Sequence, residues 1–154
     1  MDDMSNMDDN ISDSCQFSFT KCRFTEALDG RITQLEIVNF KFFIPEKNDK
    51  IYFYKIKVDR VNYPENFVYR SFKEFLELYE KLSRTFPLAK FYTLKRSPML
   101  NRASRQQIAS HRTRELKLFL KDLMNMASEI SHSDYIYTFF HPILRDQQFS
   151  DLES

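Results

Sequence analysis

The order in which the hydrophobic periodicity changes along the chain restricts its fold more than any other feature. Three segments in the first half alternate apolar and polar residues, and turns at 45–50 and 61–66 separate them. Later segments instead repeat their apolar residues every three to four positions. The first pattern is typical of half-buried strands and the second of amphipathic helices. The sequence therefore predicts an α+β domain, in which a three-stranded antiparallel sheet packs against a helical subdomain.

The expected strands differ in how regular their alternation is. They are predicted near 38–44, 52–58 and 67–72. Leu35 and Ile37 lie on the opposite phase from Val38, so an irregularity such as a β-bulge is expected near Val38. Short turns between the three segments predict a meander, in which neighbours in sequence are neighbours in the sheet.

The helical segments begin and end at recognisable residues. The helices are predicted at 72–86, 104–127 and 133–140. Pro87 ends the first of them because proline cannot continue a helix, and Ser104 is a suitable N-cap for the second. Glu74 and Glu77 are expected on the solvent-facing side of the first helix.

Charge is distributed unevenly along the 154 residues, although the whole chain carries only +1. Five aspartates and no Lys or Arg occur in the first fifteen residues. We interpret 1–28 as an acidic, mostly disordered tail, 29–146 as the folded domain, and 147–154 as a C-terminal tail or linker. Residues 90–117 hold eight Lys and Arg against one Glu, a net charge of +7. Such a stretch suggests a polyanionic partner: a nucleic acid, a phosphorylated lipid or an acidic protein.

The single glycine, Gly30, excludes several function classes. Loops that cradle phosphates with backbone amides need several glycines, so any phosphate must be bound by side chains. His111, His132 and His141 are too scattered for a metal site or a catalytic triad. The chain is therefore not expected to be an enzyme, and no cofactor or metal is predicted.

Two arginines occupy positions that are unusual for a solvated charge. Arg112 follows Ile108 by four residues and precedes Leu116 by four, which places it on the apolar stripe of its helix. Arg70 shares a face with Phe72 if the strand stays extended. A guanidinium there needs a carboxylate partner or an external anion, because its desolvation is otherwise costly. Each is a candidate phosphate ligand, and the alternative for each is a structural ion pair.

Three stretches carry a resemblance to a known family. "FVYRSFKEFLELYEKLSRTFP" at 67–87 resembles the first signature of the phox homology (PX) domain, and "HRTRELKLFLKDLM" at 111–124 resembles the second. "YIYTFFHPILRD" at 135–146, together with "DGRI" and "KIYFYKIKV" earlier in the chain, is similar to the PX module of class II phosphoinositide 3-kinases. The resemblance covers about residues 29–146.

The resemblance implies a phosphoinositide headgroup pocket between sheet, helices and an irregular loop. Carried over by position, Arg70 contacts a ring phosphate, Phe72 forms the pocket floor and Arg112 holds the far side of the inositol. The phosphate that links the ring to the lipid is assigned to a basic residue of the loop, with Lys95, Arg96 and Arg102 as candidates.

One position departs from the family pattern. Many members place the phosphate-binding arginine directly before the aromatic residue, where this chain has Ser71, so Arg70 is expected to compensate from one residue earlier. The family most often prefers phosphatidylinositol 3-phosphate, whereas class II kinase modules are associated with phosphatidylinositol 4,5-bisphosphate. The serine favours the second lipid.

The resemblance also implies a place of action. A cytoplasmic protein of this kind is recruited peripherally to endosomal or plasma membranes, in vesicle trafficking and signalling. Apolar residues of the loop are expected to insert into the anionic membrane interface; they are Phe91, Tyr92, Leu94, Met99 and Leu100.

Two other interpretations compete with a lipid-binding module. Nucleic-acid binding would use the basic stretch, but the inward register of Arg112 suits a pocket better than a flat groove. A protein-interaction adaptor with a degenerate lipid pocket is the alternative that stays open, because the arginine before Phe72 is missing.

Overall fold

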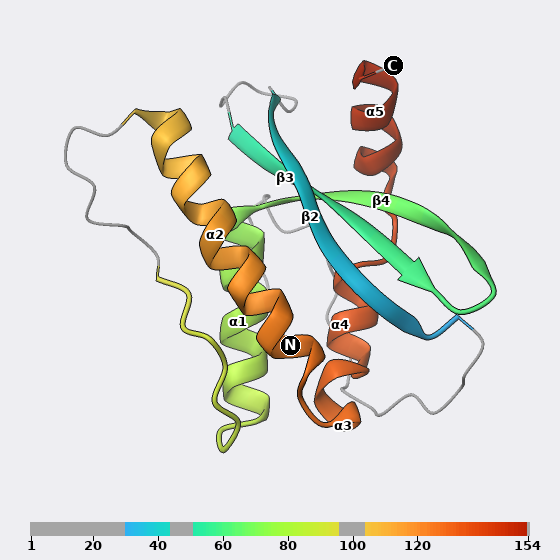
Figure 1. The fold of residues 1–154 in the computed structure, drawn as a ribbon, viewed down its shortest axis with the longest axis vertical. Coiled ribbons are helices and arrows are strands. Elements are labelled where there is room, and N and C mark those ends of the chain that lie inside the picture. The colour runs from blue at the N-terminus through green and yellow to red at the C-terminus, as the bar shows by residue number, and fades with distance from the viewer. Residues whose placement is uncertain (1–29, 44–50, 96–103, 154) are drawn as a thin grey trace, which may run out of the picture.

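The computed structural model describes residues 30–43, 51–95 and 104–153 of the chain. Within these ranges the chain forms a small sheet, two long helices and three shorter ones (Figure 1). In chain order the elements are β2 (Ile32–Phe43), β3 (Ile51–Arg60), β4 (Tyr63–Ser71), α1 (Phe72–Thr85), α2 (Arg105–Met124), α3 (Ser128–Ser131), α4 (Asp134–Phe139) and α5 (Leu144–Glu153).

The sheet has the predicted antiparallel order β2-β3-β4. The register between β2 and β3 shifts between Ile37 and Asn39, which confirms the irregularity expected near Val38. β4 begins at Tyr63 rather than Phe67, because the preceding turn is shorter than the sequence suggested. Asn62 adopts a φ of 64° in that turn, a conformation that asparagine tolerates better than most residues.

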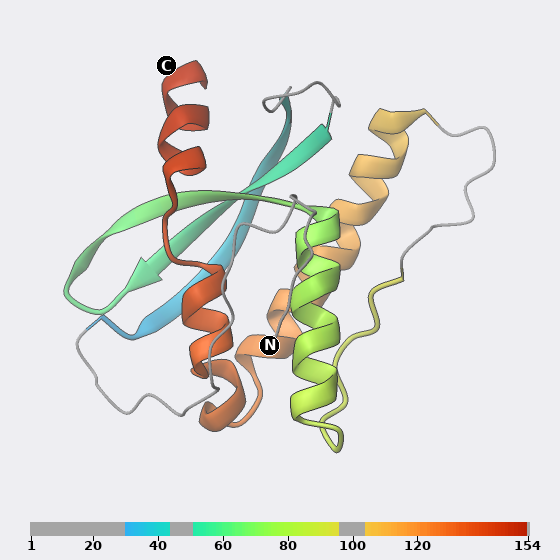
Figure 2. The same cartoon turned by 180° about the vertical axis from the view of Figure 1, so that it is seen from behind.

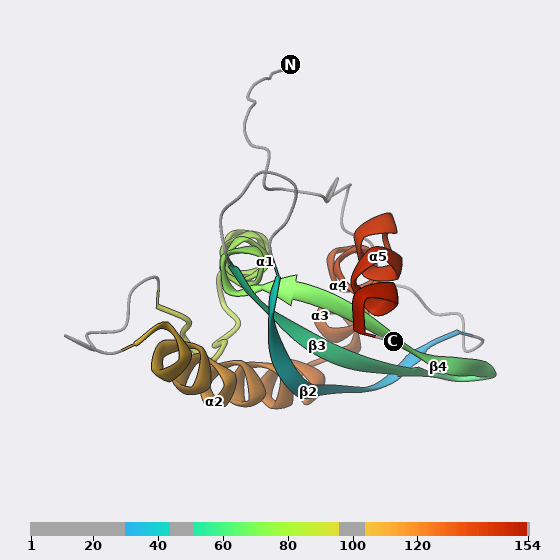
Figure 3. The same ribbon diagram turned by 90° about the horizontal axis from the view of Figure 1, so that it is seen from above.

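Both faces of the sheet are covered, each by a different set of helices. On one face, Ile56, Val58 and Val68 join the main core with residues of α1, α2 and α4. On the other face a separate cluster consists of Phe43, Phe53, Tyr69 and Phe149. Figure 3 shows α2 and α5 on opposite sides of the sheet, and the view from behind shows α5 lying across β4 (Figure 2). The α+β prediction is confirmed.

The two long helices begin with reciprocal caps. Ser71 accepts a hydrogen bond from the Glu74 backbone, while the Glu74 side chain accepts one from the Ser71 backbone. Ser104 and Gln107 make the same pair of bonds at the start of α2, which confirms Ser104 as the N-cap. Each pair satisfies two amide groups that a helix start otherwise leaves unbonded. Glu74 is consequently buried, so its predicted exposed position is wrong.

The C-terminal boundary also needs correction. Residues 144–153 form helix α5 instead of the tail or linker expected from 147. Phe149 is buried, and its ring stacks on Phe43 with centroids 4.0 Å apart and planes 4° from parallel. The helix was missed because only this one side chain supplies its apolar contact, too few to produce a period. Residues 1–28, assigned to the tail, lie outside the described ranges.

No helix among the described residues is sufficiently long and apolar to cross a bilayer.

Candidate functional site

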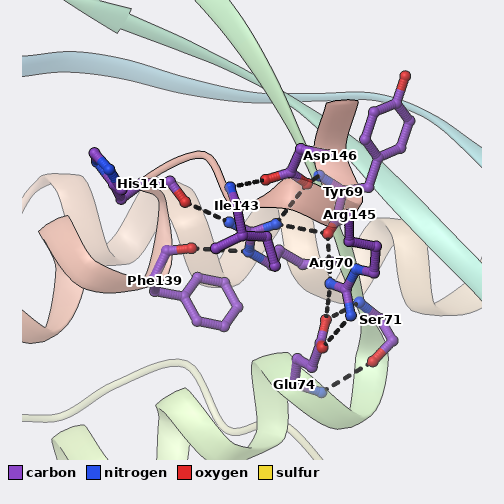
Figure 4. A network of polar contacts seen from close by, with 9 residues as sticks. All are labelled: Tyr69, Arg70, Ser71, Glu74, Phe139, His141, Ile143, Arg145 and Asp146. Atoms are coloured by element: carbon purple, nitrogen blue, oxygen red, sulfur yellow. Dashed lines mark hydrogen bonds and ion pairs between the residues drawn. The ribbon is translucent and has the colours of Figure 1, made fainter. Parts of the chain in front are cut away.

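Arg70 is the most deeply buried charged residue of the described chain, with 0% of its surface exposed. Its Nε donates to the Phe139 carbonyl at 2.8 Å, and its Nη2 donates to the His141 carbonyl at 2.8 Å (Figure 4). Its Nη1 donates to the Tyr69 carbonyl and to Asp146 Oδ1, both at 2.7 Å. The guanidinium therefore joins β4 to the end of α4, to the turn that follows it and to α5.

The Asp146 carboxylate compensates the buried charge of Arg70. Besides Arg70, its carboxylate accepts the backbone N–H of Tyr69 at 2.7 Å and that of Ile143 at 2.8 Å. Tyr69 lies on the free edge of β4, so Asp146 satisfies an amide that no further strand would bond. Burial lowers the pKa of Arg70, and the adjacent Asp146 carboxylate opposes that shift. The pair behaves as a buried ion pair with its remaining hydrogen bonds satisfied.

A second arginine stabilises the same junction between β4, α1 and α5. Arg145 forms a two-pronged ion pair with Glu74, with Nη1 2.7 Å from Oε2 and Nη2 2.8 Å from Oε1. Its Nη2 also donates to the Tyr69 carbonyl, and its guanidinium carbon lies 4.7 Å from the Phe53 ring centroid. α5 is thus tied through Arg145 to the first turn of α1 and through Asp146 to β4.

These contacts overturn the role that the resemblance implied for Arg70. A guanidinium with no exposed surface, bonded to three carbonyls and a carboxylate, is not available to a lipid phosphate. Ser71, at the position of the family's phosphate-binding arginine, holds the N-cap of α1 and is itself buried. Of the two explanations for Arg70, the structural ion pair is the correct one.

Phe72 and Arg112 do come together, as the resemblance implied. The guanidinium carbon of Arg112 lies 4.3 Å from the centroid of the Phe72 ring, within the range of a cation–π contact. Phe72 is the first residue of α1, and Arg112 lies one helical turn before the buried Leu116 of α2. Arg112 is half-buried, and this burial lowers its pKa, although an arginine stays protonated in proteins.

Tyr54 fixes the position of α2 beside this pair. Its hydroxyl donates to the Ala109 carbonyl at 3.2 Å, one turn before Arg112. Burial is the main cause that raises the pKa of Tyr54, and Arg112 opposes it, so the two side chains interact electrostatically. Because β3 and β4 pair Tyr54 with Arg70, the sheet end that holds Phe72 also faces the N-terminal half of α2.

The loop residues predicted to contact the membrane differ in how exposed they are. Leu94 is 4% exposed and belongs to the main core, which contradicts its predicted insertion. Tyr92 donates its backbone N–H to Asp122 and its hydroxyl to Glu115, and Phe91 packs against the core. Both side chains are half-buried, and their insertion into a membrane stays a prediction. Lys95 is exposed. The remaining predicted residues, Arg96, Met99, Leu100 and Arg102, lie outside the described ranges.

A separate shallow groove lies between β2 and the C-terminal half of α2. Thr33, Glu36, Lys117 and Lys121 are among the residues that line it. Neither Phe72 nor Arg112 borders it. The groove is therefore distinct from the site formed by those two side chains.

Sequence reasoning missed Asp146, Arg145 and Glu74 as the partners that explain Arg70. The local signal was present, since "RD" at 145–146 follows a short helix and "SFKE" at 71–74 has capping-box spacing. The pairing itself joins residues 76 and 71 positions apart, a separation at which a period in one segment carries no information.

Comparison with known proteins finds relatives over most of the chain. A family model described as the PX domain matches residues 61–142. A phosphatidylinositol 3-kinase of Caenorhabditis elegans, piki-1, is 40% identical over 138 residues, which is 88% of this chain but 8% of the kinase. The C2 domain-containing alpha subunit of a phosphatidylinositol 4-phosphate 3-kinase from Pongo abelii is 36% identical over 85% of this chain and 8% of its own length. The chain thus spans under a tenth of these relatives.

Solved structures show the same fold. An X-ray structure of a designed CISK-PX domain aligns with a TM-score of 0.60 and 23% identity, over 71% of this chain and all of that one. The mouse SNX19 PX domain with bound sulphate aligns with a TM-score of 0.51 and 23% identity, over 72% of this chain and 96% of that one. The chain therefore belongs to the PX domain family, whose members are non-catalytic modules that generally bind phosphoinositide lipids and associate peripherally with membranes.

Proposed function

We propose that this chain holds a phosphoinositide headgroup between Phe72 and Arg112 and so recruits the protein that contains it to a membrane. The observation that carries the proposal is the half-buried guanidinium of Arg112, 4.3 Å from the Phe72 ring. A desolvated cation beside an aromatic ring suits a ligand with a phosphate and a sugar-like face. A phosphate would also offset the desolvation that lowers the pKa of Arg112.

The positions of the charged side chains affect which ring phosphates such a pocket would bind. No arginine is offered at the start of α1, because Arg70 is engaged with Asp146 and Ser71 caps the helix. Among the described residues predicted for the pocket, the remaining charges are Arg112 on the α2 side and exposed Lys95 beyond α1. Arg96 and Arg102 stay predictions for the linking phosphate. This one-sided distribution favours phosphatidylinositol 4,5-bisphosphate over phosphatidylinositol 3-phosphate, which needs a ligand at the position of Ser71.

The protein that contains the chain is proposed to be a class II phosphoinositide 3-kinase. The support is 40% identity to the piki-1 kinase and 36% to the Pongo abelii alpha subunit, over nearly the whole chain. Lipid-kinase activity would then reside outside these residues. An endosomal or plasma-membrane location follows from the lipid and is part of the same proposal.

The direct test measures soluble headgroups, because these report the pocket without a membrane. Isothermal titration calorimetry should show that the protein binds inositol 1,4,5-trisphosphate more tightly than inositol 1,3-bisphosphate. Arg112→Ala removes a charge-assisted contact of about 1.5–3 kcal/mol, which corresponds to a loss of about ten-fold to a hundred-fold in affinity.

The matched control is Arg114→Ala, which removes the same charge from an exposed position two residues away. It should leave headgroup affinity nearly unchanged, and both variants should keep the helical circular dichroism of the parent. Equal losses in the two variants would show a diffuse charge effect instead of a pocket. Absence of headgroup binding by the parent protein would favour the adaptor with a degenerate pocket, for which the buried Arg70 and capped Ser71 are the specific observations.

A further inference from the structure

Two arginines lie at the end of the sheet where β2 begins and β3 ends, away from the first turn of α1 (Figure 1). Arg60 of β3 pairs with Ile32 of β2. The residue before Ile32 is Arg31, whose carbonyl accepts the Val61 N–H at 2.9 Å. The two arginines are therefore on neighbouring strands, offset by one position. We call Arg31, Arg60 and the α3 residue Ser128 the distal cluster.

Both guanidiniums extend to the segment that contains α3 and α4. The Arg31 Nη2 donates to the Ser128 hydroxyl at 3.2 Å. The guanidinium carbon of Arg60 lies 5.3 Å from the centroid of the Tyr137 ring. The Tyr137 hydroxyl accepts the Ile32 N–H at 2.9 Å, which fixes the ring beside the first residue of β2. Two cationic groups from adjacent strands thus reach the same short stretch of chain.

The positive charge of the distal cluster has no carboxylate partner within the part of the chain that the structure describes. None of the ion pairs found there involves Arg31 or Arg60. The Nε of Arg60 is buried and has no acceptor among the same residues. Arg70 and Arg145, in contrast, are each paired with a carboxylate. A buried guanidinium N–H without an acceptor favours an anion from outside the domain.

Three carboxylates are close to the distal cluster in sequence without neutralising it. Asp59 precedes Arg60 and therefore projects from the opposite face of β3, where it lies 4.0 Å from Lys57. Glu129 is exposed and Asp134 is half-buried. Neither of them forms an ion pair with an arginine of the cluster in the described structure. The guanidinium donors consequently stay available to an external ligand.

A phosphate dianion matches these donors. The N–H groups of a guanidinium bind two phosphate oxygens side by side. The Ser128 hydroxyl, which accepts from Arg31, can donate its own proton to a further oxygen. The lipid held at Arg112 cannot supply this phosphate, because the eight residues of β4 from Tyr63, opposite Arg60, to the start of α1 span about 26 Å.

We propose that the distal cluster is a second anion site of the domain, which binds a phosphate dianion through Arg31, Arg60 and Ser128. The phosphate belongs to a phosphorylated serine or threonine of a partner protein, or it is a free phosphate ion. The site goes beyond the proposed function and shares no residue with the headgroup pocket. It can therefore be occupied while a lipid is bound at Arg112.

A nuclear magnetic resonance titration of the Arg112→Ala protein tests the site without a contribution from the headgroup pocket. The ligands are N-acetyl-phosphoserine amide and inorganic phosphate, compared at constant ionic strength. We expect saturable shifts of the Arg31, Arg60 and Ser128 signals with at least one ligand. Arg31→Gln or Arg60→Gln should weaken that binding by about ten-fold or more, the effect of losing one charge-assisted contact.

The matched control is Arg84→Gln, which removes the same charge from an exposed position of α1. It should change the affinity by less than about two-fold. Ser128→Ala covers the case in which an arginine variant does not fold. It keeps both guanidiniums and removes one hydroxyl, so it should weaken binding by about two-fold to ten-fold.

The relative affinities of the two ligands identify the source of the phosphate. Tighter binding of the phosphoserine derivative would support a phosphorylated partner, and equal or tighter binding of inorganic phosphate would support the free ion. The absence of saturable shifts with both ligands, or equal losses in Arg60→Gln and Arg84→Gln, would overturn the site. An Arg60→Gln protein that loses binding to vesicles with phosphatidylinositol 4,5-bisphosphate, but not to either soluble ligand, would assign Arg60 to the membrane surface and likewise overturn it.

Discussion

Replacing Asp146 should destabilise the domain far more than replacing the exposed Asp151 of the same helix. The Asp146 carboxylate accepts one bond from Arg70 and two from backbone amides, all between 2.7 and 2.8 Å. Asp146→Ala leaves the buried Arg70 charge without its carboxylate, and breaking a buried pair from one side costs about 3–5 kcal/mol. Domains of this size have a free energy of unfolding of about 5–15 kcal/mol, so the loss is a large fraction of it.

Asp146→Asn should destabilise the domain less than Asp146→Ala. Asn keeps one oxygen, which can accept from Tyr69 and Arg70 as Oδ1 does, but its NH₂ group then faces the Ile143 N–H. One unsatisfied buried donor costs about 1–3 kcal/mol. The expected order of stability is therefore parent, Asp146→Asn, Asp146→Ala, measured by urea unfolding with circular dichroism. Asp151→Ala is the control and should change stability by less than about 0.5 kcal/mol.

The double variant decides between the structural and ligand roles of Arg70. Arg70→Met with Asp146→Leu removes both charges, and its destabilisation should be less than the sum of the two single changes. If it folds, it should bind inositol 1,4,5-trisphosphate within about two-fold of the parent, since Arg112 is untouched. A folded double variant that loses headgroup binding as severely as Arg112→Ala would refute the reasoning.

Three further changes test other parts of the structure. Phe149→Ala removes the ring that stacks on Phe43, so it should lower the free energy of urea unfolding by about 3–5 kcal/mol. Leu152→Ala, at an exposed position of the same helix, should lower it by less than about 0.5 kcal/mol. Tyr54→Phe should lower the free energy of unfolding by about 0.5–1.5 kcal/mol, because it removes the hydrogen bond to the Ala109 carbonyl. It should also weaken headgroup binding if that bond positions Arg112. Unchanged stability would contradict a contribution from the bond. Burial, helped by Arg31, lowers the pKa of His132 below its usual 6.5, so the folded state binds fewer protons than the unfolded chain. Stability should therefore fall as the pH drops below about 6.5, and His132→Gln should flatten that part of a urea-against-pH series; an identical slope in the variant would exclude His132 as the cause.

Local sequence patterns determined the strands and helices, because the residues that form each pattern lie within a single segment. Alternation identified the three strands and the irregularity at Val38, and Ser104 as a suitable N-cap located the start of α2. Charge and register singled out Arg112, which the structure does bring to Phe72. Each of these features depends on residues that are close in the chain, so the sequence carries them directly.

The role of Arg70 could be decided only by the tertiary structure. The two-residue period of a strand placed Arg70 on the same face as Phe72. That pattern fits a guanidinium that meets a lipid phosphate equally well as one that meets Asp146, 76 residues away. Glu74 looked solvated for the same reason, since its partner Arg145 belongs to a helix whose only apolar anchor is Phe149. A buried charge is defined by what surrounds it in space, and the neighbours that neutralise these two come from the far end of the chain.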